Sequence, residues 1–360
     1  MAKTVIQKIP QKKNGWSPAA KLAVRISYVI FLLAFTFTAV CALFIIETKE
    51  SAFDLALVEH KSVKVTEEEM TEVLPFPIGV NPRIESITEN PEVDTFFETE
   101  LTSATKDRSK LSWWKRNVSA KLTMFDWYQN LASPVSRILV IRAGDRKEEV
   151  VKSFGDILRW DKSERAVFEK TVASSSPSIV DGKFFPGRYV VDKDAIPEVV
   201  AEKVLEEFYT QVGSRYTKEI DAVVPFEDAM IIASLLEREA YDFTDMREIS
   251  GVIWNRLFSG MNLQLDATLQ YARADKGGKE WWPVPVPDDK YIKSPYNTYQ
   301  NGGLPPTPIA NPSPEAILAA LNPKETECMF YFHDKKANFH CTKTYEEHVA
   351  LLKKIYGRGK

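Results

Sequence analysis

Glu239 is the residue in this sequence whose position best suits general acid–base chemistry. Residues 225–241 are predicted to form a helix, along which Ile232 and Leu236 belong to an apolar stripe. Glu239 takes the next position of that stripe, whereas Glu237 lies about 200° around the helix axis and points elsewhere. Burial raises the pKa of a carboxyl and keeps it protonated near neutral pH, the state that a general acid needs. Helical spacing leaves a second interpretation open, in which Glu239 lies at the solvent end of the helix or pairs with an arginine.

An alternating segment follows this helix. Residues 260–266 place Leu263 and Leu265 on one side and Gln264 and Asp266 on the other. This alternation predicts a strand that buries its leucines and presents an amide and a carboxylate to a cleft.

A proline-rich loop comes next along the chain. Residues 294–299 read Ser-Pro-Tyr-Asn-Thr-Tyr, and residues 303–312 contain too many prolines for a helix or a central strand. We therefore expect a rigid loop that presents tyrosine, asparagine and threonine. Sugars are commonly held by stacking on aromatic rings and by hydrogen bonds to amides, which suits this composition. A structural loop packed by its prolines is an alternative that the sequence leaves open.

The elements expected to hold these residues are helices and short strands. Residues 138–141 are predicted as a strand, and residues 146–160 and 196–212 as helices. Ser313 is expected to cap a further helix over residues 314–321. Because strands and helices do not alternate in the βαβ manner, we predict an α+β fold without a parallel Rossmann sheet.

Residues 26–46 form an uncharged apolar run that as a helix would measure roughly 31 Å, enough to span a bilayer. Cations precede this run, and Glu47 and Glu50 follow it, which places the N-terminus in the cytoplasm by the positive-inside rule. A cleaved signal peptide and a buried core helix are the alternatives, and the length of the run disfavours both. We predict a single-pass anchor in the cell membrane, with the rest of the chain outside the cytoplasm.

Composition argues against several classes of protein. The net charge is −3, and no basic stripe interleaved with aromatic residues occurs, which disfavours nucleic-acid binding. Cys41, Cys328 and Cys341 do not have the spacing of a metal site, so neither a metal nor a cofactor is expected. Outside the membrane, Cys328 and Cys341 could form a disulfide or remain as partly buried thiols.

Several motifs together resemble the YceG-like family of endolytic lytic transglycosylases, which are membrane-anchored enzymes that cleave murein. Each motif alone is weak, whereas their order and spacing are specific. The resemblance implies that the second glutamate of a Glu-x-Glu motif, here Glu239, is catalytic. A LysM-like module usually follows the anchor in this family, and residues 51–133 match it poorly. The matching stretches are residues 233–239, 252–257, 260–268, 294–299 and 303–309.

The resemblance also implies a division of the chain into domains, with a catalytic core over residues 225–350. The expected parts are a cytoplasmic tail (1–25), a transmembrane helix (26–46), a divergent α+β region in the LysM-like position (47–135) and a YceG-like catalytic domain (136–360).

The implied activity is endolytic cleavage between N-acetylmuramic acid and N-acetylglucosamine. It forms a 1,6-anhydro end and would terminate or trim nascent glycan strands. Glu239 would act as acid and then as base, so that one carboxyl suffices where a hydrolase normally uses two. The expected partners are peptidoglycan, the membrane, penicillin-binding proteins and the elongation or division machinery. A non-catalytic, membrane-tethered scaffold that binds glycan is the alternative. The side chains expected to hold the sugars are Asn255, Gln264, Asp266, Thr268, Tyr296, Asn297, Thr298 and Tyr299.

Overall fold

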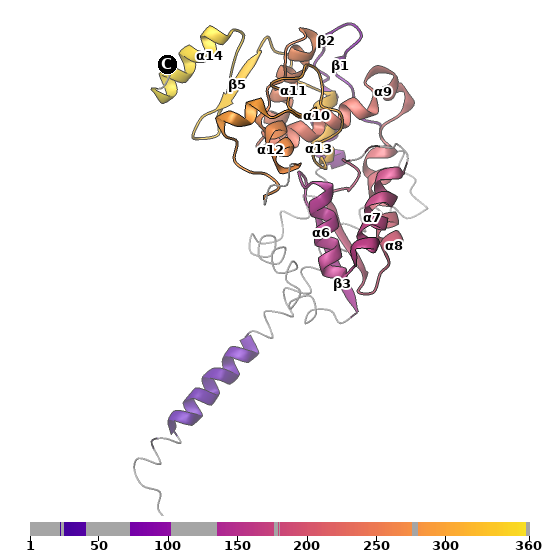
Figure 1. The fold of residues 1–360 in the computed structure, drawn as a ribbon, viewed down its shortest axis with the longest axis vertical. Coiled ribbons are helices and arrows are strands. Elements are labelled where there is room, and N and C mark those ends of the chain that lie inside the picture. Colours follow the sequence, from indigo (N-terminus) through magenta and orange to yellow (C-terminus); the bar gives the residue numbers. More distant parts are fainter. Residues whose placement is uncertain are drawn as a thin grey trace, which may run out of the picture. The chain divides into compact units, whose positions relative to one another are not determined.

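The chain divides into two compact units, Met1–Ser51 and Ala52–Lys360. In the first unit residues 25–40 are helical, while residues 41–46 of the predicted membrane helix lie outside the described residues. In the described part of the chain, no helix combines the length and the apolar character needed to cross a membrane. The structure, a computed structural model, describes residues 22, 25–40, 73–101, 135–175, 179, 181–275 and 280–357 (Figure 1).

The second unit is a mixed α+β fold, as the sequence predicts. Its described strands form separate two-stranded sheets, all of them antiparallel. The buried apolar side chains gather into a smaller and a larger core.

The smaller core lies between one two-stranded sheet and the helices packed against it. Ile138 pairs with Val190 across the sheet, and Leu139 is fully buried in the core. The rings of Phe154 and Phe168 lie 5.4 Å apart in the same core. The elements are β3 (Ser136–Ile141), α6 (Lys147–Leu158), α7 (Lys162–Ser174), β4 (Gly187–Asp192) and α8 (Pro197–Phe208).

The strand and both helices predicted in this region are confirmed, with small differences at the helix ends. Helix α6 stops at Leu158, before its predicted end, because Arg159 adopts a left-handed conformation with a φ of 59°. The helix predicted over residues 196–212 begins at Pro197 and continues from α8 into the π-helical turn η2 (Tyr209–Gly213).

Helix α10 belongs to the larger core and contacts α11, α12 and α13 (Figure 1). Its residues 229–236 are all buried. The Trp254 ring N–H of α11 donates to the Ala320 carbonyl of α13 at 2.9 Å. The predicted cap of α13 is confirmed, since the Ser313 hydroxyl accepts from the Ala316 N–H. The elements are α9 (Lys218–Val223), α10 (Phe226–Glu239), α11 (Phe243–Phe258), α12 (Asp266–Asp275), the 3-10 helix η3 (Pro287–Tyr291) and α13 (Pro314–Leu321).

Residues 73–101 contribute to this larger core. Phe76 is buried in it, and the Asn322 side chain donates to the Pro77 carbonyl at 2.6 Å. Residues 102–134, and those before residue 73 in the predicted membrane-proximal region, lie outside the described residues. The described part therefore gives no support to a LysM-like region at this position. Its elements are β1 (Val80–Asn81), β2 (Ser86–Ile87), α2 (Glu92–Phe96) and the π-helical η1 (Phe97–Leu101).

A hairpin followed by a helix lies at the C-terminal end. Phe330 pairs with Thr342, and Tyr331 pairs with Cys341, in antiparallel register. Cys328 and Cys341 form a disulfide with their Cα atoms 5.7 Å apart, so the disulfide alternative that the sequence left open is the one found. The elements are β5 (Phe330–His333), β6 (Phe339–Thr342) and α14 (Tyr345–Tyr356).

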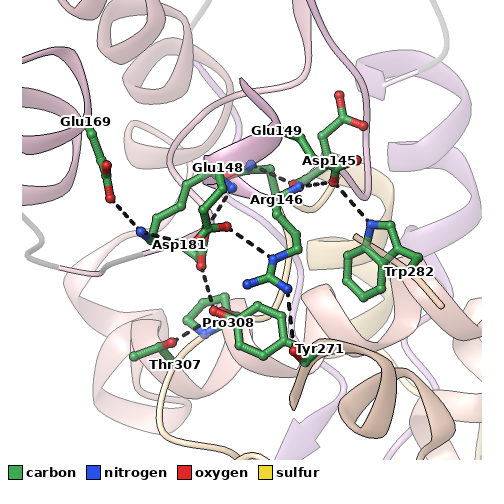
Figure 2. Close-up of polar contacts among 12 residues, drawn as sticks. Asp145, Arg146, Glu148, Glu149, Glu169, Asp181, Tyr271, Trp282, Thr307 and Pro308 are labelled. Atoms are coloured by element: carbon green, nitrogen blue, oxygen red, sulfur yellow. Dashed lines mark hydrogen bonds and ion pairs between the residues drawn. The ribbon is translucent and has the colours of Figure 1, made fainter. Parts of the chain in front are cut away.

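A buried polar network joins the two cores (Figure 2). The Arg146 guanidinium, from a residue only 1% exposed, lies 3.9 Å from the centroid of the Tyr271 ring. The Tyr271 hydroxyl donates to Asp181 Oδ2 at 3.2 Å, and the Lys147 N–H donates to Asp181 Oδ1 at 3.1 Å. Since Tyr271 belongs to α12, the network links the smaller core to that helix.

Candidate active site

Helix α10 carries the predicted acid at its C-terminal end. It begins after Pro225, which is the N-cap residue and not, as predicted, the first helical residue. The Phe226 N–H donates to Asp221 Oδ1 at 2.9 Å, which satisfies one of the free amides at the helix start. Glu239 is the last helical residue, and Ala240 leaves the helix in an extended conformation.

Both carboxyl oxygens of Glu239 accept hydrogen bonds from defined donors. Oε1 accepts from the Ala267 N–H at 3.2 Å, and Oε2 accepts from the Tyr331 hydroxyl at 3.2 Å. Burial is the largest influence on Glu239 and raises its pKa, and the negative charge of Asp266 adds to this rise. The two hydrogen bonds and His333 act in the opposite direction. A carboxyl whose pKa is raised by burial can hold a proton more readily and release it to a bound oxygen atom.

Glu237 makes different contacts. Its Oε2 accepts from the N–H and the hydroxyl of Ser313 at 3.0 and 2.6 Å. Between the two glutamates, Arg238 places its guanidinium 3.8 Å from the ring centroid of Trp282. The prediction that Glu237 and Glu239 occupy different faces is therefore confirmed, and Glu237 serves to attach α13 to α10.

The strand predicted over residues 260–266 is wrong. Residues 261–265 form a loop in which Gln264 has a left-handed φ of 52°. The N–H groups of Gln264 and Leu265 donate to the carbonyl and the hydroxyl of Thr298, at 3.1 and 3.0 Å, and not to a neighbouring strand. Leu265 is buried and Gln264 exposed, as the alternation predicts. An anchored loop produces the same alternation of burial as a strand, so the sequence pattern did not distinguish them.

Helix α12 begins directly after this loop and presents its N-terminus to Glu239. The Ala267 N–H lies in the first turn of α12, where amide groups have no partner within the helix, and it donates to Glu239 instead. The partial positive charge at a helix N-terminus stabilises a carboxylate. The arrangement therefore also supports Glu239 once it has lost its proton.

Among the predicted sugar contacts, Gln264 and Asp266 are exposed, and Tyr299 beside Asp266 is partly buried. The Tyr299 hydroxyl donates to Asp266 Oδ1 at 2.7 Å, and Lys290 Nζ lies 4.8 Å from the Tyr299 ring centroid. Burial and the Asp266 carboxylate raise the pKa of Tyr299, so its hydroxyl remains protonated. Asp266 precedes Ala267 in the chain, so this group adjoins the backbone that contacts Glu239.

Thr268, Asn297 and Thr298 are at most 2% exposed. The hydroxyls of Thr268 and Thr298 lie 2.9 Å apart. The Asn297 amide donates to the carbonyls of Lys290 and Ile292 at 3.1 and 2.8 Å. These predicted sugar contacts thus lie beneath the surface, where they hold the loop over residues 290–298 in place.

Asn255 and Tyr296 are partly buried and also bind other parts of the chain. The Asn255 amide donates to the carbonyls of Thr326 and Cys328 at 2.7 and 3.1 Å. The Tyr296 hydroxyl lies 2.8 Å from the Thr307 hydroxyl. Both side chains fix segments that lead to the site.

Tyr331 and the polar groups near it were not predicted from the sequence. His333 Nε2 lies 2.9 Å from both carboxyl oxygens of Asp245. Arg256 donates from Nε to the backbone just before β5, at 2.7 Å. The signal in the sequence is the aromatic run of β5, but its contact with Glu239 spans 92 residues and arises only from the tertiary fold.

The groups around Glu239 suit proton transfer to and from a bound polar ligand. The carboxyl can release a proton through one oxygen while the other stays fixed by the α12 backbone. Within the residues that the structure describes, no group of three or more His, Cys, Asp or Glu side chains could hold a metal ion.

A model of the YceG-like family matches residues 92–354. A protein named endolytic murein transglycosylase from Bacillus subtilis (strain 168) is 30% identical over 201 residues, which cover 56% of this chain and 52% of that protein. A protein of the same name from Streptococcus pneumoniae serotype 2 (strain D39) is 29% identical over 155 residues, which cover 43% of this chain and 28% of that protein. The match therefore spans about half the length of the first relative and less than a third of the second. A crystal structure of a YceG-like protein from Listeria monocytogenes has a TM-score of 0.52 and 26% identity, and the match covers 59% of this chain and 75% of that chain.

Proposed function

We propose that this chain, which belongs to the YceG-like family, is an endolytic lytic transglycosylase that acts on murein, as its curated relatives are named. The observation that carries the proposal is the environment of Glu239. Its carboxyl has a raised pKa and lies at the meeting point of α10, α12 and β5. The proposed enzyme is a carbon–oxygen lyase, and it needs no second carboxylate.

Glu239 would first act as the general acid. It gives its proton to the oxygen that links N-acetylmuramic acid to N-acetylglucosamine, and the bond from the muramic C1 to that oxygen breaks. An oxocarbenium-like centre forms at C1, helped by the acetamido group of the substrate. The raised pKa of Glu239 suits this step, because the acid must arrive protonated.

Glu239 would then act as the general base. Its carboxylate takes the proton of the muramic C6 hydroxyl, whose oxygen attacks C1 and closes the 1,6-anhydro ring. The Ala267 N–H and the N-terminus of α12 stabilise the carboxylate between the two steps. The two steps together consume no water, and Glu239 is protonated again at the end of the cycle.

The exposed side chains of Gln264 and Asp266, together with the partly buried Tyr299 that binds Asp266, are the part of the predicted sugar site most open to a glycan. In the proposal these side chains contact sugar hydroxyls and acetamido groups, and Tyr299 also offers a ring face. The buried members, such as Thr298 and Asn297, support the loops and do not contact the glycan.

We also propose that residues 26–46 anchor the protein in the cell membrane, with the catalytic domain outside the cytoplasm. The apolar run supports this, as do Phe31, Leu33 and Phe37, which are more than 60% exposed on the helix and would suit contact with lipid. An enzyme in this place would terminate or trim nascent glycan strands. Penicillin-binding proteins and the elongation or division machinery are its proposed partners.

Product analysis tests the proposal. Purified sacculi are digested with the full chain, and the released muropeptides are analysed by mass spectrometry. The transglycosylase produces 1,6-anhydro ends, which lack one water relative to the reducing ends that a hydrolase leaves. Reducing ends only would replace the proposal by hydrolysis, with Asp266 as the candidate second carboxylate. Binding of the chain to pelleted sacculi without any released product would favour the glycan-binding scaffold.

A further inference from the structure

We propose that Tyr331 is a positioning residue for Glu239, whose hydroxyl fixes Oε2 as the oxygen that carries and delivers the acid proton. The proposal rests on the proposed function, because it takes Glu239 as the acid. Nothing in the sequence motifs singles out Tyr331, which lies in the C-terminal hairpin, 92 residues after Glu239.

The donors around Glu239 determine where its proton can lie. The Ala267 backbone N–H can only donate, which favours Oε1 as the unprotonated, accepting oxygen of the neutral carboxyl. The proton is therefore favoured on Oε2, beside the Tyr331 hydroxyl at 3.2 Å. A hydroxyl can both donate and accept, so Tyr331 is compatible with the charged and the neutral carboxyl.

The direction of the Tyr331 hydrogen bond decides whether Glu239 can act as an acid. When Tyr331 donates to Oε2, the proton on that oxygen points away from the tyrosine and is free to reach a substrate oxygen. Burial is the largest cause that raises the pKa of Tyr331 well above its ordinary value, and the Glu239 carboxylate adds to it. The phenol therefore stays protonated and keeps a hydrogen to donate.

The hairpin gives Tyr331 a fixed position. Its ring is stacked on Phe339 of the partner strand, with centroids 5.7 Å apart and an interplanar angle of 24°. Its register partner is Cys341, whose disulfide to Cys328 closes the hairpin. The Asn255 side chain of α11 binds the Cys328 carbonyl at 3.1 Å, which ties this end of the hairpin to the larger core.

Other charged or titratable groups act on Glu239, but none of them donates a hydrogen bond to its carboxyl. Asp266 raises the pKa of Glu239 and His333 lowers it. Burial lowers the pKa values of Arg238 and Arg256, and the Glu239 charge is among the groups that oppose this shift. Tyr331 therefore differs from all of them in fixing one oxygen by direct contact. The groups are Asp266 (α12), Tyr299 (the loop beyond η3), Arg238 (α10), Arg256 (α11) and His333 (β5).

Tyr331→Phe removes the hydroxyl and keeps the ring and its stack on Phe339. The matched control is Tyr356→Phe, because the Tyr356 hydroxyl donates to the His333 carbonyl of the same strand at 2.9 Å and does not touch Glu239. Rates of release of anhydro ends from sacculi are measured against pH for the full chain and both variants. Activity falls on the basic side when Glu239 loses its proton.

In Tyr331→Phe we expect the basic limb of the pH–rate profile, where activity falls as Glu239 loses its proton, to move to higher pH by about one unit. The reason is that the carboxylate loses a hydrogen-bond donor. We also expect kcat to fall roughly tenfold with KM unchanged, since Tyr331 does not hold the sugar. Tyr356→Phe should keep the wild-type limb even if its stability falls. A limb that stays in place in Tyr331→Phe, or that moves equally in Tyr356→Phe, overturns the proposal, as does a change confined to KM.

A titration of the Glu239 carboxyl by carbon-13 NMR separates this proposal from the proposed function. Glutamate is labelled at its carboxyl carbon, and the Glu239 signal is assigned by its loss in Glu239→Gln. If the wild-type chain makes no anhydro ends, the proposed function fails, while the titration still reports whether Tyr331→Phe raises the pKa of Glu239. If Tyr331→Phe does not fold, Phe339→Leu, which loosens the ring and keeps the hydroxyl, should raise the pKa of Glu239 by a smaller amount. An unchanged titration in the folded variant overturns the proposal.

Discussion

Asp181→Asn should remove a specific pH dependence from the stability of the protein. Asp181 is fully buried between the two cores, where it accepts hydrogen bonds from the Tyr271 hydroxyl and the Lys147 N–H (Figure 2). Burial is the largest cause that raises its pKa to about 7, and the negative charge of Glu148 adds to the effect. Lys147 and Arg146 oppose the rise without cancelling it.

The direction and the magnitude of this pH dependence are set by the difference between the pKa of Asp181 in the folded state and its pKa in the unfolded state. The unfolded carboxyl has a pKa of 3.8, so between about pH 4 and pH 7 the folded state holds a proton that the unfolded state has lost. The stability linked to Asp181 is therefore fully present below the unfolded pKa and is lost as pH rises through the folded pKa. At 1.36 kcal/mol per pH unit, the loss from pH 5 to pH 8 is about 2.5 kcal/mol.

The assay is denaturant unfolding at pH 5 and pH 8, followed by tryptophan fluorescence. Asparagine cannot ionise, and it keeps an acceptor for the Lys147 N–H, so Asp181→Asn should gain about 2.5 kcal/mol relative to wild type on going from pH 5 to pH 8. The control is Asp288→Asn at an exposed site, which should follow the wild-type curve. A constant difference between wild type and Asp181→Asn at the two pH values would refute the reasoning.

Two further predictions concern the supports of the site. Thr298→Val leaves the Leu265 N–H without its buried partner and removes one of the hydrogen bonds of the Thr268 hydroxyl, so it should lower the free energy of unfolding by about 2 kcal/mol and reduce activity, whereas Thr298→Ser should stay close to wild type in thermal melts. Equal losses in the two Thr298 variants would contradict this role of the hydroxyl. Joint replacement of Cys328 and Cys341 by serine opens a loop with a sequence separation of 13 and should cost the hairpin roughly 3 kcal/mol, seen as faster amide exchange in β5. Unchanged exchange in β5 would show that the disulfide does not hold that strand.

Local patterns in the sequence were enough to predict two of the helices around the site, α10 and α13. The apolar stripe of α10 and the Ser313 cap of α13 are set by residues within one or two turns, and both are found. Helical geometry also separated Glu237 from Glu239, because neighbours on a helix axis have fixed angular offsets. These features could be predicted from the sequence because they depend only on the spacing of residues close together in the chain.

The groups that surround Glu239 could not be predicted from the sequence in the same way. The loop before α12 was predicted as a strand because alternate burial is common to both, and its anchor, Thr298, lies more than thirty residues further on. Tyr331 and Asp181 were missed because their roles come from contacts across the fold. Of the predicted sugar contacts, the sequence could give the side-chain types but not their exposure, so buried Asn297 was grouped with exposed side chains.

The most direct test of the central claim compares Glu239→Gln with Glu237→Gln on purified sacculi. Glutamine keeps the size of the side chain and removes its ability to give or take a proton. Glu239→Gln should remain folded by circular dichroism and release no 1,6-anhydro muropeptides. Glu237→Gln should still release them, since Glu237 binds Ser313 at the start of α13. Anhydro ends released by Glu239→Gln at the wild-type rate would contradict the assignment of Glu239 as the acid and base.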